Sequence, residues 1–427
     1  EKIGVRWWFD KRVVVRDSAQ GPIISDSPLL QSLDHETIAL RWAGHGVSDE
    51  FSAMLRANRA RNWDEFITAF ETFSISAQNM VYADKAGNIG KLMAAQLPAR
   101  KPGFPPFLHD PGDDAAAWDQ MIGVRGWPMS YNPEAGYIAS ANNRPPPTEI
   151  PVGYFFSPGS RITRMTALLE ANQDITFEDL HALQTDVLEP TAIAINQAFI
   201  EAVERHGLED RLSPAARAVF QMIAGWDGNY HAEAPEPVAF EAAFFNFLRR
   251  FYTPRMGEEG LHAFTSAADF ARTVPRDIKE SDGAIVSQAL AGALEDAVSV
   301  VNKFSTWGDM HRLRLRHPLG VVPVVGGRFT AANFPSGGSR QTVMKTNHVP
   351  TDKKHFAGYG SQARHISDMS DPDENYFVLL GGQDGWLNST TFVDQVEQWR
   401  AGEYVKIPLR PESVRKSFTR SMKLKPN

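Results

Sequence analysis

The most informative stretch of this sequence reads Tyr137-Ile-Ala-Ser-Ala-Asn142-Asn143-Arg144. It is followed by three prolines and, after a short apolar segment, by Ser160-Arg161 at the start of a helical pattern. An asparagine pair before prolines is by itself an ordinary turn. What the stretch says about fold and function therefore depends on the segments around it.

Composition limits the class of protein. The 427 residues are 42% apolar and 11% aromatic, which is enough to bury a large core. The 44 basic and 51 acidic residues give a net charge of -7, so we expect no nucleic-acid partner. The absence of cysteine excludes disulfides, thiolate metal sites and a cysteine nucleophile within these residues. No uninterrupted apolar run approaches roughly 20 residues, so we also expect no membrane partner.

Residues 1–158 are predicted to be mainly β-structure with one helix. The pattern predicts short strands on both sides of a turn at Gly21-Pro22, namely over 13–15, 23–24 and 37–42. A hairpin is predicted around a turn at 84–87. The one helix begins after the capping pair Asn62 and Glu65. The proline- and glycine-rich residues 101–158 predict a long wrap over a surface.

Residues 159–306 have a helical period and are predicted to form an insertion. A capping box at Thr176–Asp179 opens one helix, and Ser213-Pro214 opens another that Gly225 ends. Residues 307–427 return to β-structure, with strands predicted at 321–325 and 376–380. We therefore predict an α+β protein in which residues 1–427 form a single domain.

The usual catalytic motifs are missing from the sequence. There is no Gly-x-Ser-x-Gly elbow, although Gly337-Gly338-Ser339 comes near it, and no His-Glu-x-x-His stretch. The twelve histidines show no ligand-like spacing, so a zinc hydrolase is not predicted. His311 and His317 flank an alternating Arg/Leu strand and are interpreted as structural hydrogen-bond partners rather than bases.

A pair of acids suited to a glycosidase is a further alternative. Asp113-Asp114 and Asp371/Asp373 are the available pairs. Acids close together in glycine- and proline-rich loops are usually turn formers, so we rank this alternative far behind.

Separated segments, in order along the chain, resemble the large chain of the penicillin-acylase (penicillin amidase) family of N-terminal-nucleophile hydrolases. Each segment is weak alone, but the ordered set covers essentially the whole chain. It implies the four-layer αββα fold of that family, with the helical stretch as an insertion. The matching segments are 21–25, 39–42, 79–90, 131–143, 160–163, 307–320, 381–385 and 394–404.

The resemblance also implies a mechanism. In this family a serine at the first residue of the large chain, exposed by self-cleavage of a precursor, is the nucleophile, and its own α-amine is the base. An α-amine has a reference pKa near 8, so it can act as a base close to neutral pH. Glu1–Trp42 resembles an interior part of the family's large chain. We therefore expect the nucleophile on a separate segment of the same precursor, which also supplies a small chain.

Two catalytic residues are carried over from the resemblance. Asn142 matches the asparagine whose amide donates to the oxyanion of the tetrahedral intermediate, a contribution of about 3 kcal/mol. Arg161 matches the arginine that orients this asparagine and the nucleophile's amine. It is predicted in the first turn of a helix capped by Ser160, where a cation opposes the helix dipole. Without the resemblance, the two would be interpreted as a turn residue and a solvated arginine.

The resemblance also implies the substrate, the cofactors and the location. Met54 and Gln78 fall where the family places acyl-pocket side chains, and a glutamine there departs from the apolar pattern of phenylacetyl-preferring members. The expected substrate is a small amide, such as a penicillin, a cephalosporin or an N-acyl-homoserine lactone. No organic cofactor is expected, and the family often holds a structural calcium ion. Many relatives are periplasmic or secreted. The alternative function is that of an inactive relative acting as a binding or scaffold protein.

Overall fold

The computed structural model divides into two compact units, Glu1–Ser157 (unit 1) and Pro158–Asn427 (unit 2). Each unit has its own hydrophobic core. The single domain over residues 1–427 stays a prediction. The structure describes residues 1–6, 9–27, 37–100, 118–172, 174–267, 269–386, 389–423 and 425.

Unit 1 combines two short helices with short antiparallel strand pairs. Its helices are α1 (Glu50–Ala57) and α2 (Trp63–Ala69), and its longest strands are β5 (Gln78–Ala83) and β6 (Ile89–Ala94). The strand β9 (Ser130–Tyr131) extends the hairpin to the order β5-β6-β9. The smaller elements are β1 (Lys2–Ile3), β2 (Lys11–Arg12), β3 (Asp17–Ser18), β4 (Gly21–Pro22), η1 (Ala43–His45), β7 (Leu97–Pro98), β8 (Met121–Ile122) and η3 (Val124–Gly126).

The predicted helix and hairpin of unit 1 are confirmed. The Asn62 side chain accepts a hydrogen bond from the Glu65 N–H (2.9 Å), and the Glu65 carboxylate accepts from the N–H of Arg61 (2.9 Å). In the hairpin turn, Asp84 accepts from the N–H groups of Ala86 and Asn88. The helices and the hairpin share one small core, made of Ala53, Ile67, Ala69, Phe70, Phe73, Leu92, Ala94 and Val124.

Helix α1 was not predicted. The Asp49 side chain caps it by accepting from the Ser52 N–H (3.0 Å). Phe51, Met54 and Leu55 do stand three and four positions apart, as in a helix, but they are exposed, and the helix buries only Ala53.

Several of the strands predicted near the N-terminus are wrong. Residues 13–15 form no strand, since Val14 is 82% exposed and gains no burial from pairing. Gly21–Pro22 is strand β4, which pairs with β3, rather than a turn. Of the predicted 37–42 strand, Ala39 alone pairs among the described residues, in a bridge to Ile23. The first part of the predicted 101–158 wrap lies outside the described residues.

Unit 2 begins with the helical stretch and returns to β-structure near residue 311, as predicted. Its helices are α3 (Ser160–Glu170), α4 (Phe177–Thr185), α5 (Pro190–Arg205), α6 (Pro214–Ala224), α7 (Glu236–Ala267), α8 (Phe270–Glu280), α9 (Gly283–Lys303), α10 (Trp307–Met310), α11 (Val396–Ala401) and α12 (Pro411–Ser417), with short 3-10 turns η4 (Glu209–Arg211), η5 (Pro318–Val321) and η6 (Gly326–Phe329). The capping box of α4 and the Ser213 cap and Gly225 end of α6 are confirmed.

Two three-stranded sheets complete unit 2. One has the order β11-β10-β12, in which β10 (His311–Arg316) is antiparallel to β11 (Thr330–Pro335) and parallel to β12 (His355–Ala357). The other has the order β13-β14-β15, namely Ala363–Ser367, Asn375–Leu379 and Val405–Lys406. The strand predicted at 321–325 is wrong: η5 and η6 flank that segment, and Val324 has a left-handed φ of 69°.

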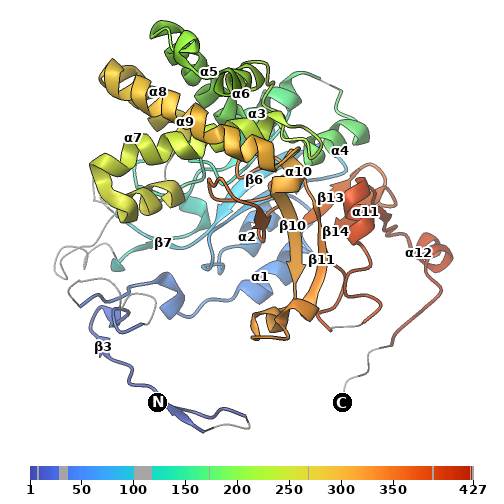
Figure 1. The fold of residues 1–427 in the computed structure, drawn as a ribbon. Coiled ribbons are helices and arrows are strands. Elements are labelled where there is room, and N and C mark those ends of the chain that lie inside the picture. The colour runs from blue at the N-terminus through green and yellow to red at the C-terminus, as the bar shows by residue number, and fades with distance from the viewer. Residues whose placement is uncertain are drawn as a thin grey trace. The chain divides into compact units, whose positions relative to one another are not determined.

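The core of unit 2 is built around α7 and α9, which lie side by side in Figure 1. Four phenylalanines of α7 recur at helical spacing and are at most 1% exposed: Phe240, Phe244, Phe247 and Phe251. Each contributes roughly 1.5–3 kcal/mol relative to an exposed side chain.

Helix α9 alone among the described helices has the length and composition to cross a membrane. It buries seven residues in the core of unit 2: Val286, Ala289, Leu290, Ala293, Leu294, Ala297 and Val300. Its acids are also bound, since Glu295 accepts from Ser213 and Asp296 accepts from Arg250. Burial in the core accounts for its apolar composition.

Candidate active site

Asn142 lies in unit 1 on a backbone that turns its side chain toward solvent. Its φ of 59° is left-handed, a conformation that asparagine tolerates better than most residues, and the residue is exposed. The loop is fixed on both sides. The Ala141 N–H donates to the Asn143 side chain (3.1 Å), and the Ser157 N–H donates to the Asn142 carbonyl (2.9 Å). An amide presented on a held backbone suits a hydrogen-bond donor that must not reorganise.

Arg161 lies in unit 2, in the first turn of α3, as predicted. It is partly buried, and this burial lowers the pKa of its guanidinium while Tyr359 raises it. The prediction that Ser160 caps this helix is wrong, because α3 begins at Ser160 and Gly159 precedes it. The buried Ser160 Oγ instead accepts from the N–H of Thr191 (3.2 Å), at the start of α5.

The two predicted acyl-pocket residues both lie in unit 1. Met54 is on α1 and 42% exposed, and Gln78 begins β5. The Gln78 amide donates to the Ser76 Oγ (3.1 Å), so its polar partner is within the chain. The Glu50 carboxylate ties α1 to the segment before β5 by accepting from two backbone N–H groups, those of Ser74 and Ile75. These bonds lower the pKa of Glu50 to about 2.

Unit 2 contains a buried polar cluster that the sequence analysis missed. Its centre is Glu241 of α7, which accepts from Arg340 (2.7 and 3.0 Å) and from the Tyr230 hydroxyl (2.7 Å). His348 Nε2 lies 3.3 Å from the same carboxylate. We call these four residues the Glu241 cluster. Burial favours the protonated acid, but Arg340 and His348 outweigh it and lower the pKa of Glu241.

A second buried acid lies beside this cluster. Glu189 accepts a hydrogen bond from Ser339, and both residues are at most 1% exposed. Burial raises the pKa of Glu189 to about 7, although Arg340 and Ser339 oppose the shift. One sequence signal was available, because Glu241 stands on the apolar stripe of α7 three residues before Phe244. Neither Glu189 nor Arg340 carried such a signal.

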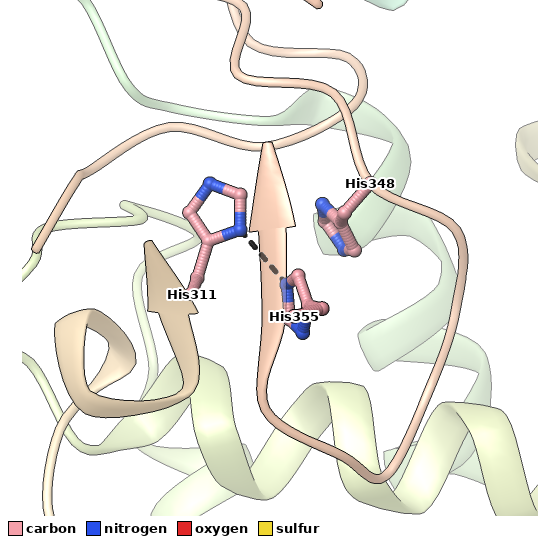
Figure 2. A group of neighbouring side chains, drawn as sticks. All are labelled: His311, His348 and His355. Carbon is pink, nitrogen blue, oxygen red and sulfur yellow. Dashed lines mark hydrogen bonds between the residues drawn. The ribbon is translucent and has the colours of Figure 1, made fainter. Parts of the chain in front are cut away.

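Three histidines come together next to the Glu241 cluster, although their spacing in the sequence gave no indication of it. His311, His348 and His355 gather around one point in Figure 2, and one ring nitrogen of each lies within 4.8 Å of the others. They are the only such group of metal-binding side chains among the described residues. His317, by contrast, accepts from the Leu319 N–H and caps η5, which fits its predicted structural role.

The calcium ion that the resemblance allows stays a prediction. Calcium takes oxygen ligands, whereas the one cluster in the described part of the chain offers imidazole nitrogens. No step of the chemistry is assigned to calcium.

Only one of the two acidic pairs of the glycosidase alternative lies in the described part of the chain. Asp113-Asp114 lies outside the described residues. Asp371 and Asp373 both accept from Arg410, and Asp373 also accepts from the backbone N–H groups of Leu409 and Arg410. These bonds give the second pair a structural role.

A solved structure supplies the fold class. A thermostable penicillin G acylase from Alcaligenes faecalis superposes with a TM-score of 0.65, covering 100% of this chain and 81% of that chain at 18% identity. The fold is therefore that of an N-terminal-nucleophile hydrolase, and the predicted α+β class with a helical insertion is confirmed.

The chain belongs to the penicillin amidase family, whose model matches residues 1–416. It is 28% identical to the penicillin acylase 2 proenzyme of Pseudomonas sp., over 93% of this chain and 52% of that protein. It is 24% identical to the acyl-homoserine lactone acylase QuiP of Pseudomonas syringae pv. tomato, over 90% of this chain and 50% of that protein. The chain thus spans about half the length of the curated relatives it matches.

Proposed function

We propose that the protein containing this chain is an acylase, which hydrolyses the amide between a carboxylic acyl group and an amine. The observation that carries the proposal is the family match over residues 1–416. Relatives named as penicillin acylase and as acyl-homoserine lactone acylase support the substrate class, a penicillin, a cephalosporin or an N-acyl-homoserine lactone.

The proposed mechanism passes through an acyl-enzyme. The N-terminal serine of the processed large chain attacks the amide carbonyl, and its α-amine takes up the proton. The amine part of the substrate leaves with this proton, and water then hydrolyses the acyl-enzyme and releases the carboxylic acid. This serine belongs to a segment of the precursor other than residues 1–427, and the name "proenzyme" of one relative is in keeping with such processing. The same resemblance supports a partner small chain and a periplasmic or secreted location.

Asn142 is the proposed oxyanion donor. Its left-handed backbone and exposed side chain support the role, because a donor must face the reacting carbonyl and hold its position as charge develops there. Arg161 is the proposed positioning residue. Its partial burial in the first turn of α3 supports a role other than that of a solvated cation.

Met54 and Gln78 are the proposed acyl-pocket residues. Glu50 accepts hydrogen bonds from the N–H groups of Ser74 and Ile75. These bonds fix the helix of Met54 to the segment that leads into Gln78, which supports a shared pocket for the two side chains. Since one N–H of the Gln78 amide already donates to Ser76, the acyl chain need not supply an acceptor for that donor.

The experiment uses the complete, processed protein with a panel of chromogenic aryl amides and aryl glycosides. The expected result is turnover of the amides alone, together with stoichiometric labelling of one serine by a sulfonyl fluoride, seen by mass spectrometry. Labelling at the N-terminal residue of the large chain would support the mechanism. A processed protein that neither turns over an amide nor takes the label would contradict it and favour the inactive, binding alternative.

A further inference from the structure

His311, His348 and His355 converge from three segments of unit 2. His311 begins β10 and His355 begins β12, and the parallel pairing of these strands places the two residues side by side. His348 lies on the connection between β11 and β12 (Figure 2). His311 and His348 are buried and His355 is partly buried. The proposed acylase mechanism uses none of these three side chains.

Hydrogen bonds decide which nitrogen of His311 carries its proton. Its Nε2 lies 3.0 Å from the Thr346 Oγ1. The Thr346 hydroxyl donates its only proton to the Gly337 carbonyl (2.9 Å), so it must accept from His311. The proton of His311 is therefore on Nε2, and Nδ1 carries a lone pair.

The same argument applies to His355. Its Nδ1 lies 2.9 Å from the Lys353 carbonyl, which can only accept, so the proton is on Nδ1. The lone pair of His355 is then on Nε2, which lies 2.8 Å from His311 Nδ1, as the dashed line in Figure 2 marks. Two lone pairs that face each other at this distance repel unless a cation lies between them.

His348 supplies the third nitrogen. Its Nε2 lies 3.3 Å from the Glu241 carboxylate and 3.2 Å from Arg340 Nη1, and its Nδ1 is buried without a hydrogen bond. An Nε2–H that donates to Glu241 leaves a lone pair on Nδ1, and this is the tautomer that the site requires. A histidine that donates its other N–H to a carboxylate or carbonyl is the usual arrangement in metal sites. The outer partner is the Glu241 carboxylate for His348 and the Lys353 carbonyl for His355, while His311 has the Thr346 hydroxyl.

We propose that His311, His348 and His355 form a binding site for a divalent transition-metal ion of the zinc class. Three imidazole nitrogens suit zinc, cobalt, nickel or copper and do not suit calcium or magnesium. Zinc–nitrogen bonds of about 2.0–2.1 Å in a tetrahedral site separate the nitrogens by roughly 3.3 Å. The observed limits of 2.8 and 4.8 Å bracket this value, so modest ring movements close the site around an ion.

The surroundings favour a structural ion. Trp307 stacks on His311, with centroids 4.7 Å apart and an interplanar angle of 13°, and covers the site on that side. The charge of Arg340 opposes a cation, but Arg340 is already paired with Glu241. The ion joins β10, β12 and the loop of His348.

Metal binding is tested on the purified full chain after treatment with a chelator and dialysis. Titration with Co²⁺ is expected to give one bound equivalent and a visible absorption band of tetrahedral type, which Zn²⁺ then displaces. Saturating Zn²⁺ is expected to raise Tm by roughly 5 °C, because the ion binds the folded state. Binding of less than a tenth of an equivalent would overturn the proposal.

Variants separate this site from adventitious binding. His355→Gln, at the partly exposed ligand, is expected to abolish the Co²⁺ band and the Tm shift, and His365→Gln, at an exposed histidine of β13, is expected to leave both. Thr346→Val keeps the shape but removes the partner of His311 Nε2, and is expected to weaken binding 10- to 100-fold. Equal binding by the wild-type chain and His355→Gln would overturn the proposal, whether or not the protein hydrolyses amides.

Discussion

The Asn142 loop of unit 1 and the Glu241 cluster of unit 2 differ in whether their polar side chains are exposed or buried. Asn142 is exposed, and two hydrogen bonds hold its loop, one from the Ala141 N–H to the Asn143 side chain and one from the Ser157 N–H to the Asn142 carbonyl. Glu241 and Arg340 are buried and bind each other. Tyr230 donates to Glu241, and His348 lies within 3.3 Å of the same carboxylate. An exposed group on a held backbone can serve a substrate. The buried pair of Glu241 and Arg340 stabilises the fold.

The largest expected effect is in the Glu241 cluster. Arg340→Met removes the cation from two buried acids, Glu241 and Glu189, and should lower the free energy of unfolding by about 3–5 kcal/mol. The control Arg400→Met breaks an exposed pair with Glu397 and should change it by about 0–1 kcal/mol. Urea unfolding measures both. Equal losses would remove the distinction between a buried cluster and a surface pair.

A pH titration of stability tests Glu189. The pKa of Glu189 in the folded protein, about 7, lies above the ordinary value of 4.5, so its contribution to stability is present below pH 4.5 and is lost as pH rises toward 7. Between pH 5 and pH 8, Glu189→Gln should therefore gain about 3 kcal/mol relative to the wild-type chain. The difference in stability between the two proteins removes the contribution of the histidines, whose lowered pKa values make stability rise with pH. A pH-independent difference would contradict the raised pKa.

A substitution at Gln78 tests the proposed acyl pocket. Gln78→Leu should shift the ratio of kcat/KM for a phenylacetyl amide over a polar acyl amide by about 10-fold toward the apolar group. Asn79→Leu, at the next position of β5, points to the opposite face of the strand and is the control. The same shift in both variants would mean that Gln78 does not face the substrate.

The smallest expected effect is at Ser160, whose side chain joins the start of α3 to the start of α5. Ser160→Ala removes the acceptor of the Thr191 N–H and should cost about 1 kcal/mol of unfolding free energy. Thr163→Ala, on the exposed side of α3, should cost less. Thermal unfolding of both variants measures the difference. A larger loss for Thr163→Ala would contradict the structural role of Ser160.

Local signals were readable in the sequence, and tertiary ones were not. The caps at Asn62, Thr176 and Ser213 depend on residues three positions apart, so they were predicted. The strand predicted at 321–325 was wrong because valine's preference for strands cannot outweigh the glycines and prolines that shape η5 and η6.

The residues of the candidate site could not be predicted from local sequence patterns. Asn142 and Arg161 were identified through the resemblance, since neither stands out by composition or spacing. The three histidines are 37 and 7 residues apart along the chain, so only the pairing of β10 with β12 brings them together.

The most direct test of the account is the kcat of Asn142→Ala in the complete, processed protein, measured beside its urea unfolding midpoint. The account predicts a loss of about 10²- to 10³-fold in kcat. The midpoint should fall only slightly, because alanine adopts the left-handed φ of 59° less readily than asparagine, at a cost of about 1–2 kcal/mol. Asn58→Ala, at an exposed asparagine after α1, should change neither. Full activity of Asn142→Ala, or a loss that its unfolding midpoint explains, would contradict the role of Asn142 as the oxyanion donor.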